Sequence, residues 1–343
     1  MNPNRAADRQ VLVPQNLASH VLSAVGSGQP FVTLEGATMG TTWTVRCILP
    51  EPLSAQAIQA EIEATLDRII RQMSHWAPES DLCRFNRAPA NSWHPLPDEF
   101  FHVLQIALEV AEASNGALDP TVGRLVDLHG FGPHEPAPDL SDADFEIAHQ
   151  QMGWRRLSLD PTSHRALQPG DCQLDLSSIA KGGAVDLISE VLLAHDSPAF
   201  LVEIGGEIRG HGCKPDGSPW WCLLENPPDA RADSLAETVV ALCGLSLASS
   251  GDFARRRTHR GREISHLIDP GTGSAASMDL ASVSVLAPTC ILADAWATAL
   301  YIAGPEHGPL LAESHGLAAR FIHRHGPGVY RESTTSAYRE MLD

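Results

Sequence analysis

The segment LASVSVLAPTCILADAWATALYI, residues 280–302, places a strand pattern directly before a helix pattern. Small and β-branched residues fill 280–286, which is typical of a strand, and apolar residues dominate 290–302 at helical spacing. Asp294 and Thr298 are four residues apart and therefore project from one face of that helix. Mg²⁺ accepts such carboxylate and hydroxyl oxygens. A helix cap at Asp294 and a Thr298 hydroxyl bonded to the backbone would explain the same pair.

Outside this segment, short strand patterns alternate with amphipathic helix patterns. Helices are predicted at 54–73, 98–115, 141–152 and 180–194. Strands are predicted at 31–35, 41–48, 156–159, 166–168, 199–204, 220–224, 238–242 and 264–268, with a turn over 36–40. No repeat or linker divides the chain. We therefore expect an α+β fold in which residues 31–343 form one body of largely antiparallel sheet with packed helices, preceded by a flexible arm at 1–30.

The composition is that of a globular enzyme, with 343 residues of which 43 % are apolar and 19 % charged. The net charge of −18 disfavours nucleic acid and anionic membrane surfaces as partners, because both would be repelled. No apolar run reaches the roughly 18 residues of a membrane span. The seven cysteines are scattered, and residues 1–30 show neither a signal peptide nor a cysteine for lipidation. We expect a cytoplasmic protein, periplasmic only if this N terminus is incomplete.

A second segment, DLSSIAKG at 175–182, places an acid, two hydroxyls and a cation just before the helix predicted at 180–194. Exposed N–H groups and the helix dipole favour an anion at such a position. Lysine occurs in this chain at Lys181 and Lys214, so a lysine in this setting is informative. The segment matches neither the Walker A nor the Rossmann pattern. It predicts a phosphate or ribose site, with an ordinary helix cap as the alternative.

A third segment, HLIDPGTG at 266–273, follows a strand pattern and ends in a turn. His266 could act there as a general base on a hydroxyl, with Asp269 three residues later. Since the chain has 16 histidines, a structural or exposed role is the alternative for any one of them.

Taken in order, these segments resemble the ApbE-like flavin transferases, the FAD:protein FMN transferases, from about residue 31 to 304. The order of the matches is more specific than any single one. The matching motifs are MGT at 39–41, SHWAPES at 74–80 followed by Asn86, SNGALDPT at 114–121, GFG at 130–132, and the elements at 175–182, 266–273 and 294–298.

The resemblance implies an ApbE-like, T-fold-related architecture that binds FAD and Mg²⁺. The flavin or adenine nucleotide would contact Met39, Trp76, Ala117, Leu118, Asp119, Asp175, Lys181 and Leu267. Mg²⁺ would be held by Asp294, Thr298 and an oxygen contributed near Ser178 or Ala180. His266 is the candidate base, with Asp269 and Asp294 as alternatives.

The implied reaction is Mg²⁺-dependent transfer of FMN from FAD to a Ser or Thr hydroxyl of an acceptor flavoprotein, through a phosphoester bond, with release of AMP. The acceptor would carry a flavinylation motif of the type Asp-x-x-Ser/Thr-x-x-Thr. Two alternatives stay open at this point: a Mg²⁺-dependent FAD pyrophosphatase that gives FMN and AMP, and a non-catalytic protein that binds or delivers FAD. Water and a hydroxyl need the same metal and base, so the residues do not separate them.

Overall fold

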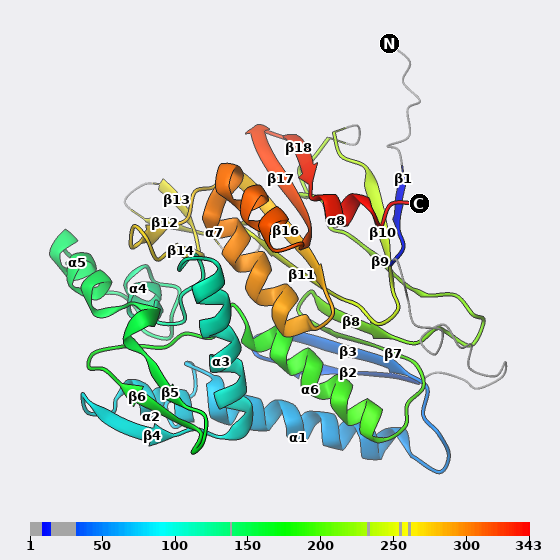
Figure 1. The fold of residues 1–343 in the computed structure, drawn as a ribbon, viewed down its shortest axis with the longest axis horizontal. Helices are drawn as coiled ribbons and strands as arrows, with labels where there is room; N and C mark the ends of the chain where they lie inside the picture. The colour runs from blue at the N-terminus through cyan, green and yellow to red at the C-terminus, as the bar shows by residue number, and fades with distance from the viewer. Residues whose placement is uncertain (1–8, 15–31, 138, 232–233, 254–255, 260–261) are drawn as a thin grey trace.

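The computed structural model describes residues 9–14, 32–137, 139–231, 234–253, 256–259 and 262–343. In these residues an eight-stranded antiparallel sheet forms the centre of the molecule (Figure 1). In sheet order its strands are β18 (Val329–Thr334), β17 (Ala318–Gly326), β16 (Leu280–Ala287), β11 (Ser246–Gly251), β8 (Glu207–His211), β7 (Phe200–Ile204), β3 (Thr41–Cys47) and β2 (Val32–Thr38). The predicted α+β class with antiparallel sheet is confirmed.

Long helices cover one face of this sheet. They are α1 (Ala55–Met73), α3 (Asp98–Ala113), α6 (Ala180–Ala194) and α7 (Cys290–Ser314). The Ser54 hydroxyl accepts a hydrogen bond from the Ala57 N–H at 3.2 Å and caps α1 as predicted. The helix predicted at 290–302 is the first part of α7, which breaks at Gly304, where φ is 81°. Alternate side chains of β3 and β7 point into the core beneath these helices.

A smaller sheet covers the opposite face. It contains β1 (Arg9–Leu12), β10 (Glu237–Leu242) and β9 (Trp220–Leu223), and the short helix α8 (Ser336–Arg339) packs nearby. The flexible-arm prediction is wrong for residues 9–13. Arg9–Leu12 pair in parallel with β10, Leu12 is fully buried, and the Val13 N–H donates to the Met341 carbonyl at 2.7 Å. Residues 1–8 and 15–30 of the predicted arm lie outside the described residues.

Shorter elements surround the helices. They are α2 (Asp81–Asn86), β4 (Ser92–Pro95), α4 (Gly123–Leu128), α5 (Asp142–Gln151), the 3₁₀ turn η1 (Trp154–Arg156), β5 (Ser158–Asp160), β6 (Arg165–Gln168), β12 (Arg256–His259), β13 (Arg262–Ser265), β14 (Ile268–Asp269) and β15 (Ser274–Ala275). The single strand predicted at 264–268 is wrong. β13 ends at Ser265 and β14 begins at Ile268, so that His266 and Leu267 lie between two strands. The turn predicted at 36–40 is also too long. Only Met39 and Gly40 form it, with φ of 48° and 75°.

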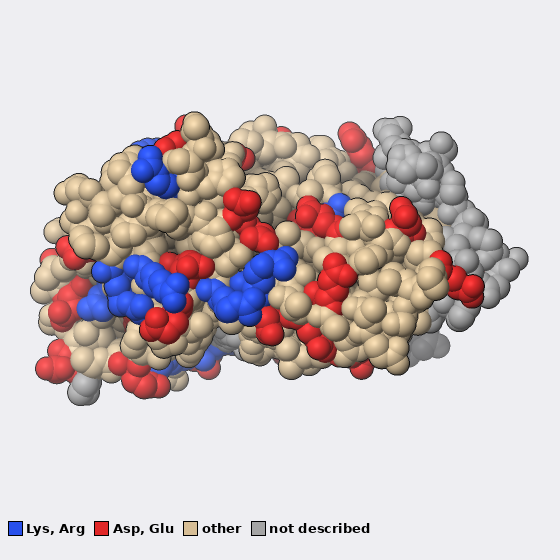
Figure 2. Space-filling model, turned by 90° about the horizontal axis from the view of Figure 1, so that it is seen from below, with Lys and Arg blue, Asp and Glu red and all other residues tan. Residues whose placement is uncertain are grey.

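The surface mixes charges of both signs. On the face that carries α1, arginines lie among carboxylates (Figure 2), in ion pairs such as Arg68–Glu99 and Arg165–Asp160. No helix in the described part of the chain combines the length and apolar character that a bilayer crossing requires.

The packing of α6 against α7 is unusually close at Gly182. A Cβ atom built there would overlap the Cys290 carbonyl oxygen and lie 2.8 Å from Asp294 Cβ. At the next position, Gly183, the nearest atoms are side-chain methyl groups and not backbone, Val103 Cγ2 at 3.2 Å and Ile291 Cδ1 at 3.5 Å. A side chain at position 182 would therefore force the two helices apart, whereas one at 183 would need only side-chain adjustment.

These neighbouring glycines give a matched test of the helix contact. We expect Gly182→Ala to lower the free energy of unfolding by about 1–3 kcal/mol, because the α7 backbone must shift. Gly183→Ala should stay within about 1 kcal/mol of the wild type, since alanine favours the helix and offsets the tighter contact. Urea unfolding followed by circular dichroism measures both. Equal losses for the two variants would contradict the close contact at Gly182.

Candidate functional site

A cavity of about 1670 Å³ opens beside the starts of α6 and α7. Most of the site residues predicted from the sequence line it. They are Met39, Trp76, Leu118, Asp119, Asp175, Ser178, Ala180, Lys181, His266, Leu267, Asp294 and Thr298. Ala117 and Asp269 are not among the lining residues. The fold thus brings segments that are more than 250 residues apart in the chain to one cavity.

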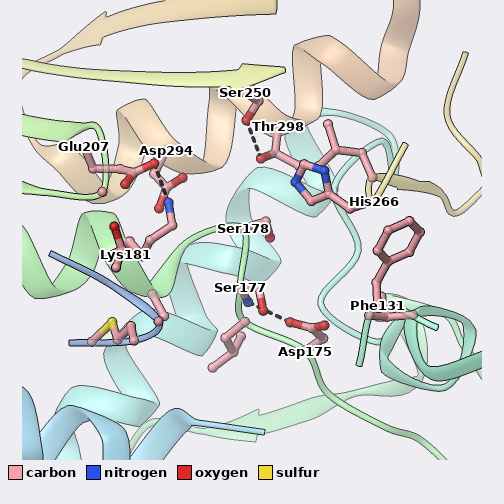
Figure 3. A pocket seen from close by; sticks show the side chains of 18 of the residues that line it. Phe131, Asp175, Ser177, Ser178, Lys181, Glu207, Ser250, His266, Asp294 and Thr298 are labelled. Atoms are coloured by element: carbon pink, nitrogen blue, oxygen red, sulfur yellow. Dashed lines mark hydrogen bonds and ion pairs between the residues drawn. The ribbon is translucent and has the colours of Figure 1, made fainter. Parts of the chain in front are cut away.

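Asp294 and Thr298 lie on the first turns of α7, on the face that meets the cavity (Figure 3). Both side chains are buried, and Asp294 Oδ2 accepts a hydrogen bond from the Gly182 N–H at 2.9 Å. The Thr298 hydroxyl lies 2.8 Å from the Ser250 hydroxyl on β11. Asp294 therefore does not cap its own helix. Asp186 of α6 does so, with its two oxygens accepting from the Cys290 and Ile291 N–H groups at 3.0 and 2.9 Å.

The start of α6 supplies the other half of this end of the cavity. Ser177, Ser178 and Ala180 line the cavity where the helix begins. The Gly182 N–H donates to Asp294 and not to the Ser178 carbonyl four residues earlier, which is the usual partner in a helix. The Ser178 carbonyl oxygen is thus left without that hydrogen bond. The Ala180, Gly182 and Gly183 N–H groups are already hydrogen-bonded, so this helix end favours an anion through its dipole.

Lys181 and Glu207 form an ion pair next to Asp294 (Figure 3). Burial lowers the pKa of Lys181, but the Asp294 and Glu207 carboxylates more than offset this, so that the pKa lies above its usual value. Burial raises the pKa of Glu207 to about 7 although Lys181 opposes the rise. Burial likewise raises the pKa of Asp294, against the effects of Lys181 and the Gly182 N–H. One ammonium group is thus shared by two carboxylates.

Asp175 lies before α6 and is buried. Its Oδ1 accepts the Ser177 N–H at 2.7 Å and lies 3.6 Å from His75 Nδ1. Asn86 fixes the preceding residue: its side chain donates to the Leu174 carbonyl at 3.0 Å and accepts the Leu174 N–H at 2.8 Å. Asn86 therefore holds the segment that delivers Asp175 to the cavity.

Asp119 organises a loop of the cavity wall. Oδ1 accepts the Thr121 N–H at 2.8 Å, and Oδ2 accepts the Trp154 N–H at 2.9 Å. Burial raises the pKa of Asp119, while these hydrogen bonds act against the rise. Leu118 is buried beside it, and Ala117 packs against the core behind. This loop shapes the wall through Leu118 and Asp119.

His266 lies at another part of the cavity wall, between β13 and β14 (Figure 3). Its ring packs edge-on against Phe131, with ring centroids 6.3 Å apart. Asp269 instead stabilises the following turn, where its carboxylate accepts hydrogen bonds from the Gly271 N–H at 2.8 Å and the Thr272 hydroxyl at 2.9 Å. The geometry therefore favours His266 over Asp269 as a group that can meet a ligand.

Glu207, Ser250 and His75 are among the cavity residues that were not predicted as site residues. Glu207 follows Gly205-Gly206, and Ser250 lies in Ser249-Ser-Gly-Asp252, two stretches whose composition is equally typical of turns. His75 adjoins Trp76 within the motif at 74–80. An acid directly after a glycine pair was the one available signal for Glu207, and it is weak without knowledge of its ion pair with Lys181.

Comparison with known proteins identifies the fold and the family together. The family model described as the ApbE family matches residues 39–321. The chain belongs to the ApbE family. The match spans the cavity segments from Met39 to Thr298.

Curated and structural relatives agree with this assignment to the ApbE family. A Haemophilus influenzae protein named FAD:protein FMN transferase is 34 % identical over 330 residues, which cover 94 % of each chain. The apo crystal structure of Pseudomonas stutzeri flavinyl transferase ApbE has a TM-score of 0.83 and 35 % identity, covering 91 % of this chain and 96 % of that one. The flavin transferase ApbE from Vibrio cholerae has a TM-score of 0.81 and 31 % identity, covering 91 % and 99 %.

The hydrogen bonds of Asn86 generate a stability prediction. We expect Asn86→Ala to lower the free energy of unfolding by about 1–3 kcal/mol, because it removes both hydrogen bonds and leaves the Leu174 backbone unsatisfied. Gln59→Ala is the control, since the hydrogen bond of its side chain within the described part of the chain is to the exposed Glu63, and it should change stability by less than about 0.5 kcal/mol. Urea unfolding measures both, and indistinguishable values would argue against the assigned role of Asn86.

Proposed function

We propose that this protein transfers the FMN part of FAD to a Ser or Thr hydroxyl of an acceptor protein, forming a phosphoester and releasing AMP. The observation that carries the proposal is the convergence of Asp294, Thr298, Lys181 and the start of α6 at one cavity. They provide hard oxygen ligands for a metal ion, a cation, and a helix end that favours an anion. Enzymes that transfer phosphoryl groups use groups of these kinds. Relatives in the ApbE family that are named FAD:protein FMN transferases support the same reaction.

The dimensions of the cavity suit a dinucleotide. Its volume of about 1670 Å³ exceeds the roughly 300–1,000 Å³ of ordinary small-molecule sites. The wall offers apolar surface at Leu118 and Leu267, and Trp76 stays 58 % exposed at the cavity. Aromatic and apolar surfaces of this kind suit a flavin ring, and the remaining volume can admit an acceptor segment.

The donor set also fits Mg²⁺. The second carboxylate oxygen of Asp294, Oδ1, accepts no hydrogen bond from the described residues, and the Ser178 carbonyl has lost its helical partner. The Thr298 hydroxyl adds a neutral oxygen on the same helix face, and Ala180 lies on the adjoining wall. Mg²⁺ would be held by these oxygens and would neutralise charge on the FAD pyrophosphate.

The residues of the chain would then divide the remaining work. Lys181 would pair with a pyrophosphate oxygen, and the dipole at the start of α6 would favour the same anion. His266 would accept the proton of the acceptor hydroxyl as that oxygen attacks the phosphorus of the FMN half. The bond from this phosphorus to the bridging oxygen breaks, and AMP leaves with the bridging oxygen. Most of the rate enhancement would come from positioning and electrostatics.

The deciding experiment incubates the purified protein with FAD, Mg²⁺ and an acceptor domain bearing an Asp-x-x-Ser/Thr-x-x-Thr sequence. We expect AMP release that matches an FMN-sized gain in the intact mass of the acceptor. AMP with free FMN would instead indicate a pyrophosphatase, and bound but intact FAD would indicate a binding or delivery protein. A chelator such as EDTA should stop AMP release.

Loss of the Asp294 carboxylate should abolish most of this activity. We expect Asp294→Ala to lower the transfer rate by roughly 100-fold or more, because the charged metal ligand is lost. Asp279→Ala is the control, since Asp279 is exposed and, among the described residues, its carboxylate accepts only the Ser277 hydroxyl, and it should transfer at the wild-type rate. Wild-type transfer by Asp294→Ala would refute the metal assignment.

The role of His266 is tested separately. His266→Ala should slow transfer by about 10²–10⁴-fold while FAD affinity changes little, because a general base acts on the acceptor and not on FAD. His134→Ala, which alters an exposed histidine paired with Asp127, serves as the control. Transfer at the wild-type rate by the His266 variant would show that another residue acts as the general base.

A further inference from the structure

Glu207 occupies an unusual position for a carboxylate. It is the first residue of β8 and is 3 % exposed. The turn that precedes it uses Gly205 and Gly206 at φ of 59° and 103°, and a Cβ at Gly205 would lie 2.8 Å from Thr41 Cγ2. The two glycines therefore let β7 and β8 connect tightly against β3 and bring Glu207 to the cavity wall next to Lys181.

The surroundings of Glu207 do little to stabilise its charge. Oε1 pairs with Lys181, while Oε2 is buried without a hydrogen-bond partner among the described residues. Burying a carboxylate with one unsatisfied oxygen is unfavourable, and an apolar residue of similar size would be easier to accommodate in a strand. Glu207 is therefore poorly explained as a stabilising residue. Its strongest contact is the one to the Lys181 ammonium.

Lys181 lies next to two neighbouring carboxylates that compete for its charge. Its side chain is 30 % exposed, and both Glu207 and Asp294 attract its charge. A lysine side chain has a flexible four-carbon stem and no fixed orientation of its own. With Glu207 absent, the ammonium would be drawn to Asp294 alone and would compete there with a bound cation. With Glu207 present, the ammonium is paired with Glu207 instead.

We propose that Glu207 is a positioning residue that holds the Lys181 ammonium away from Asp294 and toward the cavity, so that Lys181 meets the pyrophosphate while Asp294 stays available to a divalent cation. This inference rests on the proposed function of the site. It assigns to Glu207 an effect that acts through Lys181, without contact between Glu207 and FAD.

A double-mutant cycle tests this dependence. We expect Glu207→Gln to weaken FAD binding by about tenfold in the presence of Mg²⁺, the size of effect expected for one charge-assisted contact. The variant should also need several-fold more Mg²⁺ for half-maximal FAD binding. Glu207→Asp, which keeps the charge on a shorter side chain, should recover part of both losses. Lys181→Met should weaken FAD binding by itself, and adding Glu207→Gln to it should change the affinity by less than about twofold.

The control is Glu203→Gln on β7. Glu203 accepts the Gly206 N–H at 2.7 Å, and glutamine keeps an oxygen for that contact. Its FAD affinity and Mg²⁺ requirement should equal those of the wild type. Titration calorimetry with FAD at several Mg²⁺ concentrations provides these values without an acceptor, and circular dichroism checks that each variant is folded.

The outcomes separate this inference from the proposed function. Equal losses caused by Glu207→Gln in the wild-type and Lys181→Met backgrounds would overturn the inference, as would wild-type binding and Mg²⁺ dependence in Glu207→Gln. If Glu207→Gln does not fold, Glu207→Asp decides in the same two backgrounds. If the wild-type protein binds FAD but modifies no acceptor, the transfer reaction is contradicted. The double-mutant cycle on FAD binding would still test the role of Glu207, because it needs no acceptor.

Discussion

The close approach of α6 to α7 is the constraint on which the candidate site depends. Gly182 lets the α7 backbone come within contact of α6, and its N–H donates to Asp294. Asp186, one turn further along α6, accepts two N–H groups at the start of α7. The two helices are therefore fixed to each other at their N-terminal ends. The start of α6 and the face of α7 that carries Asp294 and Thr298 then line one cavity, where the α6 dipole favours an anion.

This arrangement concentrates charge in a space that is partly removed from water. Lys181 is shared by Asp294 and Glu207, and Thr298 is hydrogen-bonded to Ser250. Electrostatic effects are stronger there than at the surface, because the surrounding protein screens them less than water does. Groups held in place before a ligand arrives need little reorganisation when charge develops. The helix contact thus links the packing of the fold to the chemistry proposed for it.

Sequence patterns predicted the elements whose signals are local. The helical spacing of apolar residues predicted the bounds of α6 at 180–194, and Ser54 was predicted as the residue before α1. β8 and β11 were missed because their glycine and serine residues also suit turns, and their strand conformation depends on hydrogen bonds from neighbouring strands. The arm was misjudged for the same reason: β1 is four residues long and is ordered by pairing with β10, more than 220 residues away.

The sequence by itself determined the fold class, the two helices that bear Asp294 and Lys181, and most of the residues that line the cavity, because periodicity and the order of motifs are properties of the chain. Only the tertiary structure decided which of these groups touch. It joined Glu207 to Lys181 and Ser250 to Thr298, and it left Asp269 in a turn and Ala117 behind the wall. Contacts of this kind depend on strand order and on helix separation, and no stretch of local sequence encodes either one.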